Sequence, residues 1–222
     1  MLFQITQACY ALYLSLAIHN DLHPGNIFIT YRSGEVHNIL YVINGEKYPV
    51  SSDMCARLYD FDRSYAVREG NNKVLTLFTC DSANQCNTLS VSKDYAKILC
   101  YVLKKMRAIG LDVTPLAGTL FDTDNVNLFA HKYAEGMDES MGQHSCFLKY
   151  TDHFGKMTPI SSEDFIANLY PYPTILRNLF NAMTLSDPTL TFQTSDNITD
   201  TVVCNETDFD PLSGRYIIKT TM

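Results

Sequence analysis

The chain has 222 residues, of which 46% are hydrophobic and 18% charged, with 10 glycines and 8 prolines. This composition is typical of a globular protein and excludes disordered, collagen-like and low-complexity chains. The formal net charge of −7 gives no basic field to attract nucleic acid or an anionic membrane, so we expect neither partner, whereas a basic protein substrate would be attracted.

Residues 1–18 are apolar with a helical period and contain neither lysine nor arginine. A signal peptide begins with positive charge, and this stretch falls just short of a membrane span. The pattern therefore predicts a buried helix. A polar loop follows at 19–26, where Pro24 and Gly25 forbid helix.

Extended segments come next in the chain. Residues 27–31 predict a strand, and residues 36–50 predict a β-hairpin because Asn44-Gly45 is a strong hairpin signal between two extended runs. A further strand at 56–59 ends in Asp60-Phe61-Asp62. The polar segment 63–91 predicts an ordered loop.

The second half is predicted to be mostly helical. A helix from Lys93 to about Ile109 has one apolar face and ends at Gly110. Shorter helices are predicted at 125–133, 161–169 and 174–183.

The whole chain, 1–222, is expected to form a single domain, with a helical part at 92–185. Residues 186–222 are rich in Thr, Asp and Asn, which predicts a loosely packed tail, with Tyr216-Ile217-Ile218 as a candidate extended patch.

The seven cysteines are scattered and form no C-x-x-C pair. An odd number of dispersed thiols indicates a reducing compartment, so we expect the protein in the cytoplasm or the nucleus. Cys80, Cys86, His144 and Cys146 have spacings at which zinc is rarely bound, so we predict no zinc site there.

Three polar residues are candidates for chemistry. Asp21 and Asn26 lie five positions apart on the loop between the first helix and a strand, and Asp60 ends a later strand, so the three side chains can converge. Phosphoryl transfer needs one carboxylate to accept the hydroxyl proton, and a second carboxylate with an amide oxygen to hold Mg²⁺. The residue types match these roles.

Two motifs in the same order as in protein kinases support this interpretation. H-x-D-L-x-x-x-N is present as His19, Asp21, Leu22 and Asn26, and Asp60-Phe61-Asp62 stands where kinases have D-F-G. A lone H-x-D would more often be a solvated cap, but the two motifs together are specific. The chain resembles the C-terminal lobe of the protein-kinase-like superfamily.

The resemblance implies a role for each matching residue, with ATP and Mg²⁺ as cofactors. Asp21 corresponds to the catalytic base, Asn26 and Asp60 to the Mg²⁺ ligands, and Phe28 to the apolar floor beneath adenine. His23 takes the place of the usual lysine near the γ-phosphate.

Three further residues have interpretations that come from the resemblance or from packing. His19 and Phe61 are expected to be packing residues. Asp94 resembles the buried aspartate that ties the catalytic loop to the following helix, although an ordinary helix N-cap explains it equally well.

Departures from the common pattern narrow the resemblance. Asn20 replaces the arginine that pairs with a phosphorylated activation loop, so we expect activity without loop phosphorylation, although Arg63 or Arg68 offers a substitute cation. The insertion between Asn26 and Asp60, with D-L-H and no A-P-E, resembles haspin-type kinases. The D-F-D triplet resembles kinases of large DNA viruses, for which the compartment would be the host cytoplasm or nucleus.

The implied fold class is α+β: the mainly α-helical large lobe of a kinase-like fold with small β-hairpins. No G-x-G-x-x-G loop and no V-A-I-K lysine occur, so the small ATP-gripping N-terminal lobe is expected to be absent or supplied by a longer gene product, and the chain alone should bind Mg²⁺-ATP weakly.

The implied function is a serine/threonine protein kinase that transfers phosphate to a protein hydroxyl, with a basic protein as the favoured substrate. Two alternatives stay open. One is a catalytically weak, pseudokinase-like interaction module. The other is a small-molecule phosphotransferase of the aminoglycoside or choline type, because those enzymes share the H-x-D-L-H-P-x-N loop.

Overall fold

The computed structural model describes residues 1–31, 34–70, 72, 93–121, 148–151, 157–160, 169–193 and 197–205. The chain divides into two compact units. Unit 1 comprises Met1–Leu16, Phe28–Leu58 and Pro171–Met222, and unit 2 comprises Ala17–Ile27 and Tyr59–Tyr170. Both units are therefore discontinuous in sequence.

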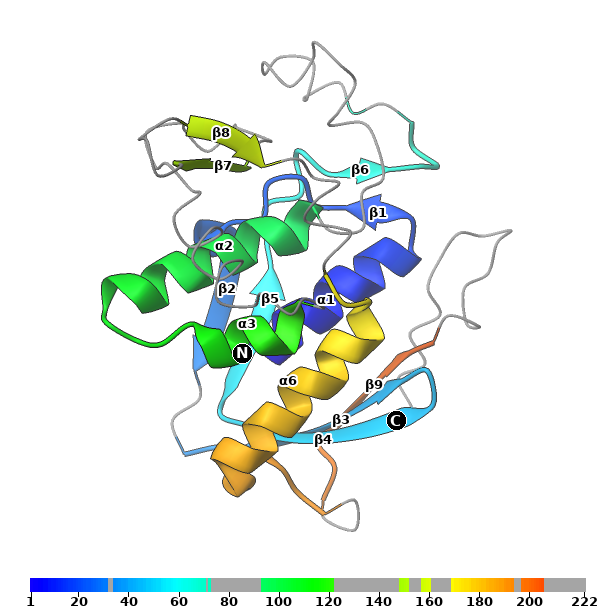
Figure 1. Ribbon diagram of the computed structural model, residues 1–222. Coiled ribbons are helices and arrows are strands. Elements are labelled where there is room, and N and C mark those ends of the chain that lie inside the picture. Colours follow the sequence, from blue (N-terminus) through cyan, green and yellow to red (C-terminus); the bar gives the residue numbers. More distant parts are fainter. Residues whose placement is uncertain are drawn as a thin grey trace. The chain divides into compact units, whose positions relative to one another are not determined.

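Unit 1 combines two long helices with five strands (Figure 1). Within it, the strand predicted at 27–31 is confirmed, and the helix predicted at 174–183 is present but longer. The elements are α1 (Leu2–Leu14), β2 (Ile27–Tyr31), β3 (His37–Ile43), β4 (Glu46–Ser52), β5 (Met54–Leu58), α6 (Tyr172–Ser186), the 3₁₀ helix η5 (Pro188–Leu190) and β9 (Asp200–Cys204).

The predicted hairpin is confirmed as β3 and β4. Asn44 and Gly45 form its turn with φ values of 50° and 82°, which Asn and Gly adopt more readily than other residues. The two strands pair antiparallel from Ile43 opposite Glu46 to His37 opposite Ser52. The two-residue turn therefore sets the register of the whole hairpin.

A third strand that the sequence did not indicate completes this sheet. β9 pairs parallel with β3, with Asp200 beside Ile39 and Cys204 beside Ile43, and gives the strand order β4-β3-β9. Thr201, Val202 and Val203 are favourable strand residues inside a segment whose overall composition indicated loose packing. A parallel partner far away in sequence leaves no local signal.

Aromatic side chains make up much of the core of unit 1. Phe3 on α1 lies 5.2 Å from the Tyr41 ring on β3, 5.7 Å from Tyr48 on β4 and 6.3 Å from Phe180 on α6. Each fully buried aromatic side chain removes a large apolar area from water. The long helices and the hairpin are therefore held together around Phe3.

The first helix, α1, carries one buried polar side chain, Gln4, that bonds to the backbone of β5. Gln4 is buried, and its Nε2 donates to Met54 O at 3.1 Å while its Oε1 accepts from Ala56 N at 2.7 Å. The amide thus satisfies the backbone of β5 as a neighbouring strand would. Gln4 therefore has a structural role.

Buried tyrosines make the stability of unit 1 sensitive to alkaline pH. Burial, with the hydrogen bond to Glu46, raises the pKa of Tyr48 to about 12, and burial also raises the pKa of Tyr41 above its ordinary value. The unfolded hydroxyls ionise near pH 10, so the stability is complete below that pH and is lost as the pH rises towards 12.

We expect Tyr48→Phe to lessen this alkaline loss. Between pH 10 and 12 the wild-type free energy of unfolding should fall by on the order of 2 kcal/mol more than that of the variant. Urea unfolding followed by circular dichroism measures the difference, with the exposed Tyr31→Phe as the matched control. An equal alkaline loss in wild type and Tyr48→Phe would contradict the prediction.

Unit 2 contains the helix predicted from Lys93 to Ile109, which is confirmed as α2. One face of α2 buries Tyr95, Ile98, Leu99 and Leu103. The elements are β1 (Ala17–Ile18), the 3₁₀ helix η1 (Pro24–Asn26), β6 (Tyr65–Ala66), α2 (Lys93–Ala108), α3 (Thr114–Leu120), β7 (Leu148–Thr151) and β8 (Met157–Ile160).

The expectation of a mainly α-helical large lobe is wrong. Of the described residues, 40% are helical and 29% lie in strands, and the strands form four small sheets. The strand pair β7–β8 lies within the part at 92–185 that was expected to be helical, and β9 extends the sheet of the first hairpin. Short strands stabilised by partners elsewhere in the chain have too little local periodicity to be recognised.

Several predicted features lie outside the described residues. They are the helix at 125–133, nearly all of the helix at 161–169, most of the loop at 63–91, the patch at 216–218, and the four cysteine and histidine residues considered for zinc.

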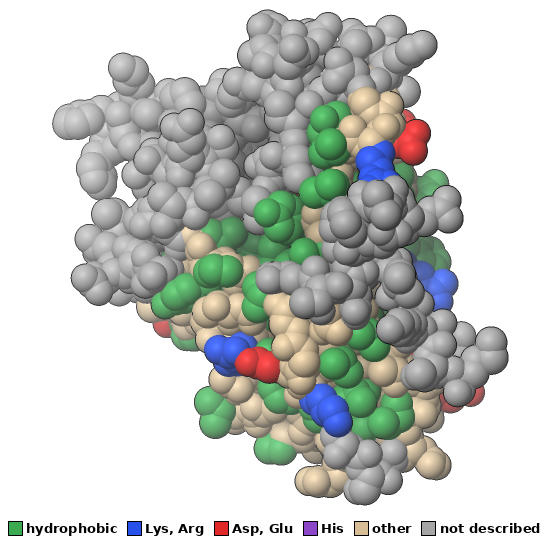
Figure 2. All heavy atoms as spheres, turned by 90° about the vertical axis from the view of Figure 1, so that its right-hand side faces the viewer, with side chains coloured by type: hydrophobic (Ala, Val, Ile, Leu, Met, Phe, Trp, Pro, Cys, Tyr) green, Lys and Arg blue, Asp and Glu red, His purple; other side chains and the backbone are tan. Residues whose placement is uncertain are grey.

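The described surface carries few charges on the face drawn in Figure 2, where blue and red side chains are scattered among hydrophobic and uncharged ones. None of the described helices has the length and apolar character needed to cross a membrane.

Candidate active site

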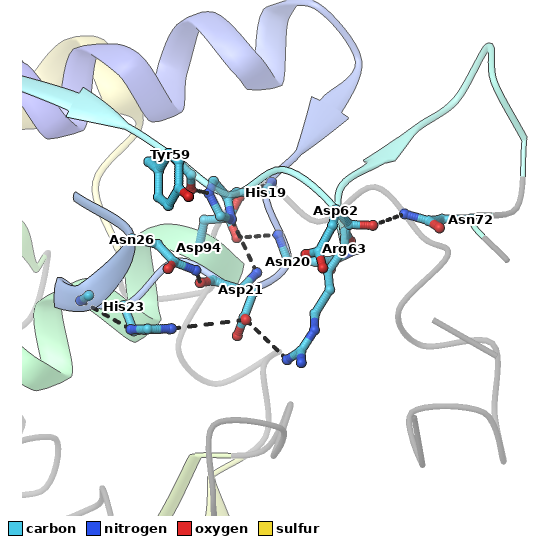
Figure 3. Close-up of polar contacts among 11 residues, drawn as sticks. His19, Asn20, Asp21, His23, Asn26, Tyr59, Asp62, Arg63, Asn72 and Asp94 are labelled. Atoms are coloured by element: carbon cyan, nitrogen blue, oxygen red, sulfur yellow. Dashed lines mark hydrogen bonds and ion pairs between the residues drawn. The ribbon is translucent and has the colours of Figure 1, made fainter. Parts of the chain in front are cut away.

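The predicted catalytic loop, residues 19–26, lies in unit 2 and is placed by a short strand pair. β1 pairs antiparallel with β6, so that Ala17 lies opposite Ala66 and Ile18 opposite Tyr65. The loop that follows β1 therefore lies beside residues 59–64, which precede β6 (Figure 3). Two segments about 40 residues apart in sequence meet at this place.

Asp94 on α2 ties the start of the loop to the helix. Its buried carboxylate accepts hydrogen bonds from His19 N at 2.5 Å and from Asn20 N at 2.8 Å. Buried backbone N–H groups need acceptors, and an ionised carboxylate is a strong one. Of the two interpretations of Asp94, the structure therefore shows the tie to the loop.

Asn20 has the backbone conformation that this tie requires. Its φ is 67°, in the left-handed region that asparagine tolerates better than most residues. Its side-chain Nδ2 donates to Arg63 O at 3.1 Å. Asn20 thus joins the catalytic loop to the segment after Asp60-Phe61-Asp62, without the charge of the arginine that it replaces in the resemblance.

Asn26 links Asp21 with the strand end that carries Asp60. Its Nδ2 donates to Asp21 O at 2.9 Å, and its backbone O accepts from Tyr59 N at 2.9 Å. Both Asp21 and Asn26 are buried. Because Tyr59 precedes Asp60 directly, the second bond brings Asp60 next to the loop.

His19 is a buried packing residue, as its place in the motif predicted. It is fully buried, its Nε2 donates to Tyr59 O at 2.7 Å, and its ring centroid lies 4.7 Å from that of Phe61. The Phe61 side chain is 46% exposed, so its ring packs on one side only.

The backbone conformation of Asp60 is constrained, and its side chain is exposed. Its φ is 63°, the left-handed conformation that turns the chain sharply after Tyr59. The next carboxylate, Asp62, is also exposed, and its backbone O accepts from Asn72 Nδ2 at 2.8 Å. Asn72 donates in addition to Ser64 O at 2.7 Å and so fixes the turn that follows Asp60.

The side chain of Asp21 has basic neighbours on two sides (Figure 3). Its Oδ2 lies 3.0 Å from Arg63 Nη1 and 4.0 Å from His23 Nε2. The sequence pattern indicated Arg63 only as a substitute partner for a phosphorylated loop and gave no sign of this ion pair. The sequence feature that could have indicated this contact is the position of Arg63 directly after the D-F-D triplet.

Four of the five predicted site residues belong to the same unit, and the contacts above join three of them, Asp21, His23 and Asn26. Asp21, His23, Asn26 and Asp60 all belong to unit 2. Phe28, the expected floor beneath adenine, lies on β2 in unit 1, where its side chain is 63% exposed.

The ligand types at this place fit Mg²⁺. The Asn26 amide donates through Nδ2, which leaves its Oδ1 as the side-chain acceptor. Asp60 is exposed and directly follows Tyr59, whose N–H donates to Asn26 O. Mg²⁺ prefers hard oxygen ligands and is often bound through one or two carboxylates with several waters. Among the described residues, no group of three or more His, Cys, Asp or Glu side chains is arranged for a metal ion.

A hollow of about 160 Å³ lies in unit 1. Its lining includes both acidic and basic side chains, and it contains none of the predicted site residues. It is lined by Thr30, His37, Ile39, Asp53, Met54, Cys55, Arg57 and Asp200.

Comparisons with protein-family profiles, with curated proteins and with solved structures find no match to this chain. Its function is therefore inferred from the geometry of the site and from the two motifs.

Proposed function

We propose that this protein transfers the γ-phosphoryl group of Mg²⁺-ATP to a serine or threonine hydroxyl of a protein. The observation that supports this most is the pair of hydrogen bonds made by Asn26, to Asp21 O and from Tyr59 N. They join the candidate base to the segment that carries the candidate metal ligand. Preorganised positioning of this kind is the main part of catalysis of phosphoryl transfer.

The reaction follows from the roles of these side chains. The acceptor oxygen forms a bond to the γ-phosphorus while the bond from that phosphorus to the bridging oxygen of ADP breaks, and Asp21 takes the proton of the acceptor hydroxyl. Asn26 holds the backbone of Asp21 in place. Asn26 and Asp60 would hold Mg²⁺, which supplies neutralisation of the phosphate charge when bound.

A protein acceptor is favoured over a small molecule. The net charge of −7 favours a basic partner, and Asp60 is followed by Phe61 and preceded by the β3–β4 insertion, as in the haspin-type resemblance. Parallel assays with a basic protein, choline and an aminoglycoside distinguish the acceptors. Phosphate transfer to either small molecule alone would replace this part of the proposal.

The proposal includes a reducing compartment, either cytoplasm or nucleus. Within the described residues, Cys9, Cys55 and Cys204 form no disulfide, and Cys9 and Cys204 are buried in unit 1. Free thiols of this kind persist where glutathione keeps proteins reduced.

The experiment that tests the function compares Asp60→Asn with wild type. An amide cannot balance the charge of Mg²⁺, so we expect the rate of phosphoryl transfer to a basic protein to fall at least about 100-fold. The rate is measured with millimolar Mg²⁺-ATP and labelled γ-phosphate. Asp53→Asn makes the same chemical change in unit 1 and serves as the control, with turnover expected to stay within about twofold.

Two outcomes would count against the proposal. Equal turnover in wild type and Asp60→Asn would remove Asp60 from the metal site. Nucleotide binding by wild type without any transfer to protein or small molecule would identify a pseudokinase-like interaction module.

A further inference from the structure

Arg63 follows the candidate metal ligand Asp60 by three residues, and its guanidinium forms an ion pair with the candidate base Asp21. Its Nη1 lies 3.0 Å from Asp21 Oδ2, and the two side chains are only 16% and 8% exposed. The ion pair therefore lies largely away from water, directly at the carboxylate that would accept the proton (Figure 3).

The backbone around Arg63 is fixed to the same loop. Arg63 O accepts from Asn20 Nδ2 at 3.1 Å, and the segment before it is bonded to His19 and Asn26 through Tyr59. The guanidinium is thus supported by a rigid backbone, as a group that must meet a substrate atom should be.

His23, the other basic side chain near Asp21, does not provide the permanent positive charge that Arg63 provides. Its Nδ1 accepts from Gly25 N at 3.1 Å, so the ring proton that faces Asp21 is on Nε2, 4.0 Å from Oδ2. His23 therefore offers a donor whose charge depends on pH, whereas an arginine stays protonated at every accessible pH.

The phosphoryl group must come within a few ångströms of Asp21, because Asp21 binds the hydroxyl that attacks it. Its equatorial oxygens carry negative charge that needs fixed donors. A guanidinium is planar and presents its N–H donors in a fork, a geometry that can bridge two anionic groups.

We propose that Arg63 is a catalytic residue that binds the transferring phosphoryl group. This inference rests on the proposed function and adds the phosphate-binding cation to it. Before substrate arrives, the bond to Asp21 keeps the guanidinium in place and leaves neither buried charge unpaired. When the phosphoryl group is in place, the fork of Arg63 spans Asp21 and the phosphoryl oxygens.

The test compares the affinities for two nucleotide probes in the full 222-residue chain. Mg²⁺-ADP lacks the transferring group, and Mg²⁺-ADP with aluminium fluoride mimics its planar transition state. Titration calorimetry measures both affinities for wild type, Arg63→Gln and Arg63→Lys. Arg57→Gln, an exposed arginine on β5, is the matched control.

We expect Arg63→Gln to weaken binding of the aluminium fluoride complex at least about tenfold while ADP affinity stays within about twofold. Arg63→Lys keeps the charge but loses the fork, so it should weaken the complex several-fold. Arg57→Gln should match wild type for both probes. A residue with a merely structural role would change both affinities together.

Each other outcome overturns the inference. Equal weakening of both probes, or unchanged affinity for the fluoride complex, would show that Arg63 does not contact the phosphoryl group. If Arg63→Gln does not fold, Arg63→Lys alone decides by the same comparison. If the wild type binds neither probe, both the proposed function and this inference fail. If Asp60→Asn removes binding of the aluminium fluoride complex and Arg63→Gln does not, only the inference about Arg63 fails.

Discussion

Asp21→Asn should lower the rate of phosphoryl transfer on the order of 1000-fold, while the affinity for Mg²⁺-ADP changes by less than about twofold. The asparagine keeps the size of the side chain and the backbone O that accepts from Asn26, but it cannot take the proton of the acceptor hydroxyl. In the proposed mechanism the base contacts the acceptor hydroxyl and not the nucleotide, so the loss should appear in kcat.

The measurement is steady-state transfer to a basic protein together with titration by Mg²⁺-ADP. Asp62→Asn is a suitable control, because Asp62 is exposed and its hydrogen bond from Asn72 goes to the backbone O. That control should change kcat less than about threefold. A kcat for Asp21→Asn within tenfold of wild type would refute the role of Asp21 as base.

Asp94→Ala should lower the free energy of unfolding of unit 2 by about 3–5 kcal/mol. The change removes the acceptor of two buried N–H groups, those of His19 and Asn20, and each bond to a charged acceptor contributes about 1.5–3 kcal/mol. The catalytic loop would lose its tie to α2, so turnover should fall as well.

Urea unfolding gives the free energy, and amide hydrogen exchange at His19 and Asn20 shows whether the loop is released. Asp112→Ala provides the matched comparison, because the Asp112 carboxylate also accepts a backbone N–H, that of Thr114, but at an exposed position. Its loss should cost only about 1 kcal/mol. Equal effects of the two variants would mean that Asp94 is no more than an ordinary helix cap.

Local sequence patterns were sufficient to predict the elements whose structure depends on residues close together in the chain. The Asn44-Gly45 turn predicted the β3–β4 hairpin, and the apolar period of 93–109 predicted α2, because a turn type and a helix face depend on neighbouring residues only. For the candidate site, the order of Asp21, Asn26 and Asp60 indicated phosphoryl transfer without any tertiary information.

The balance of helix and strand could not be obtained this way. β9 forms because its backbone N–H and C=O groups pair with β3 in parallel, with about 160 residues between the paired positions. The strands β7 and β8 have four residues each, too few for a distinct periodic pattern. Pairing over such a distance is decided by tertiary packing, so the helical lobe implied by the resemblance was wrong.

The amino-acid sequence by itself determined the hairpin and the long helices and singled out the candidate residues for metal binding and proton acceptance, since these depend on side-chain chemistry and short-range geometry. Only the tertiary structure decided what those side chains contact. The bonds from His19 and Asn20 to Asp94 and the ion pair of Asp21 with Arg63 join residues 42 to 75 positions apart. Such contacts form because buried polar groups must be paired within the folded chain, and no local pattern specifies which partner they find.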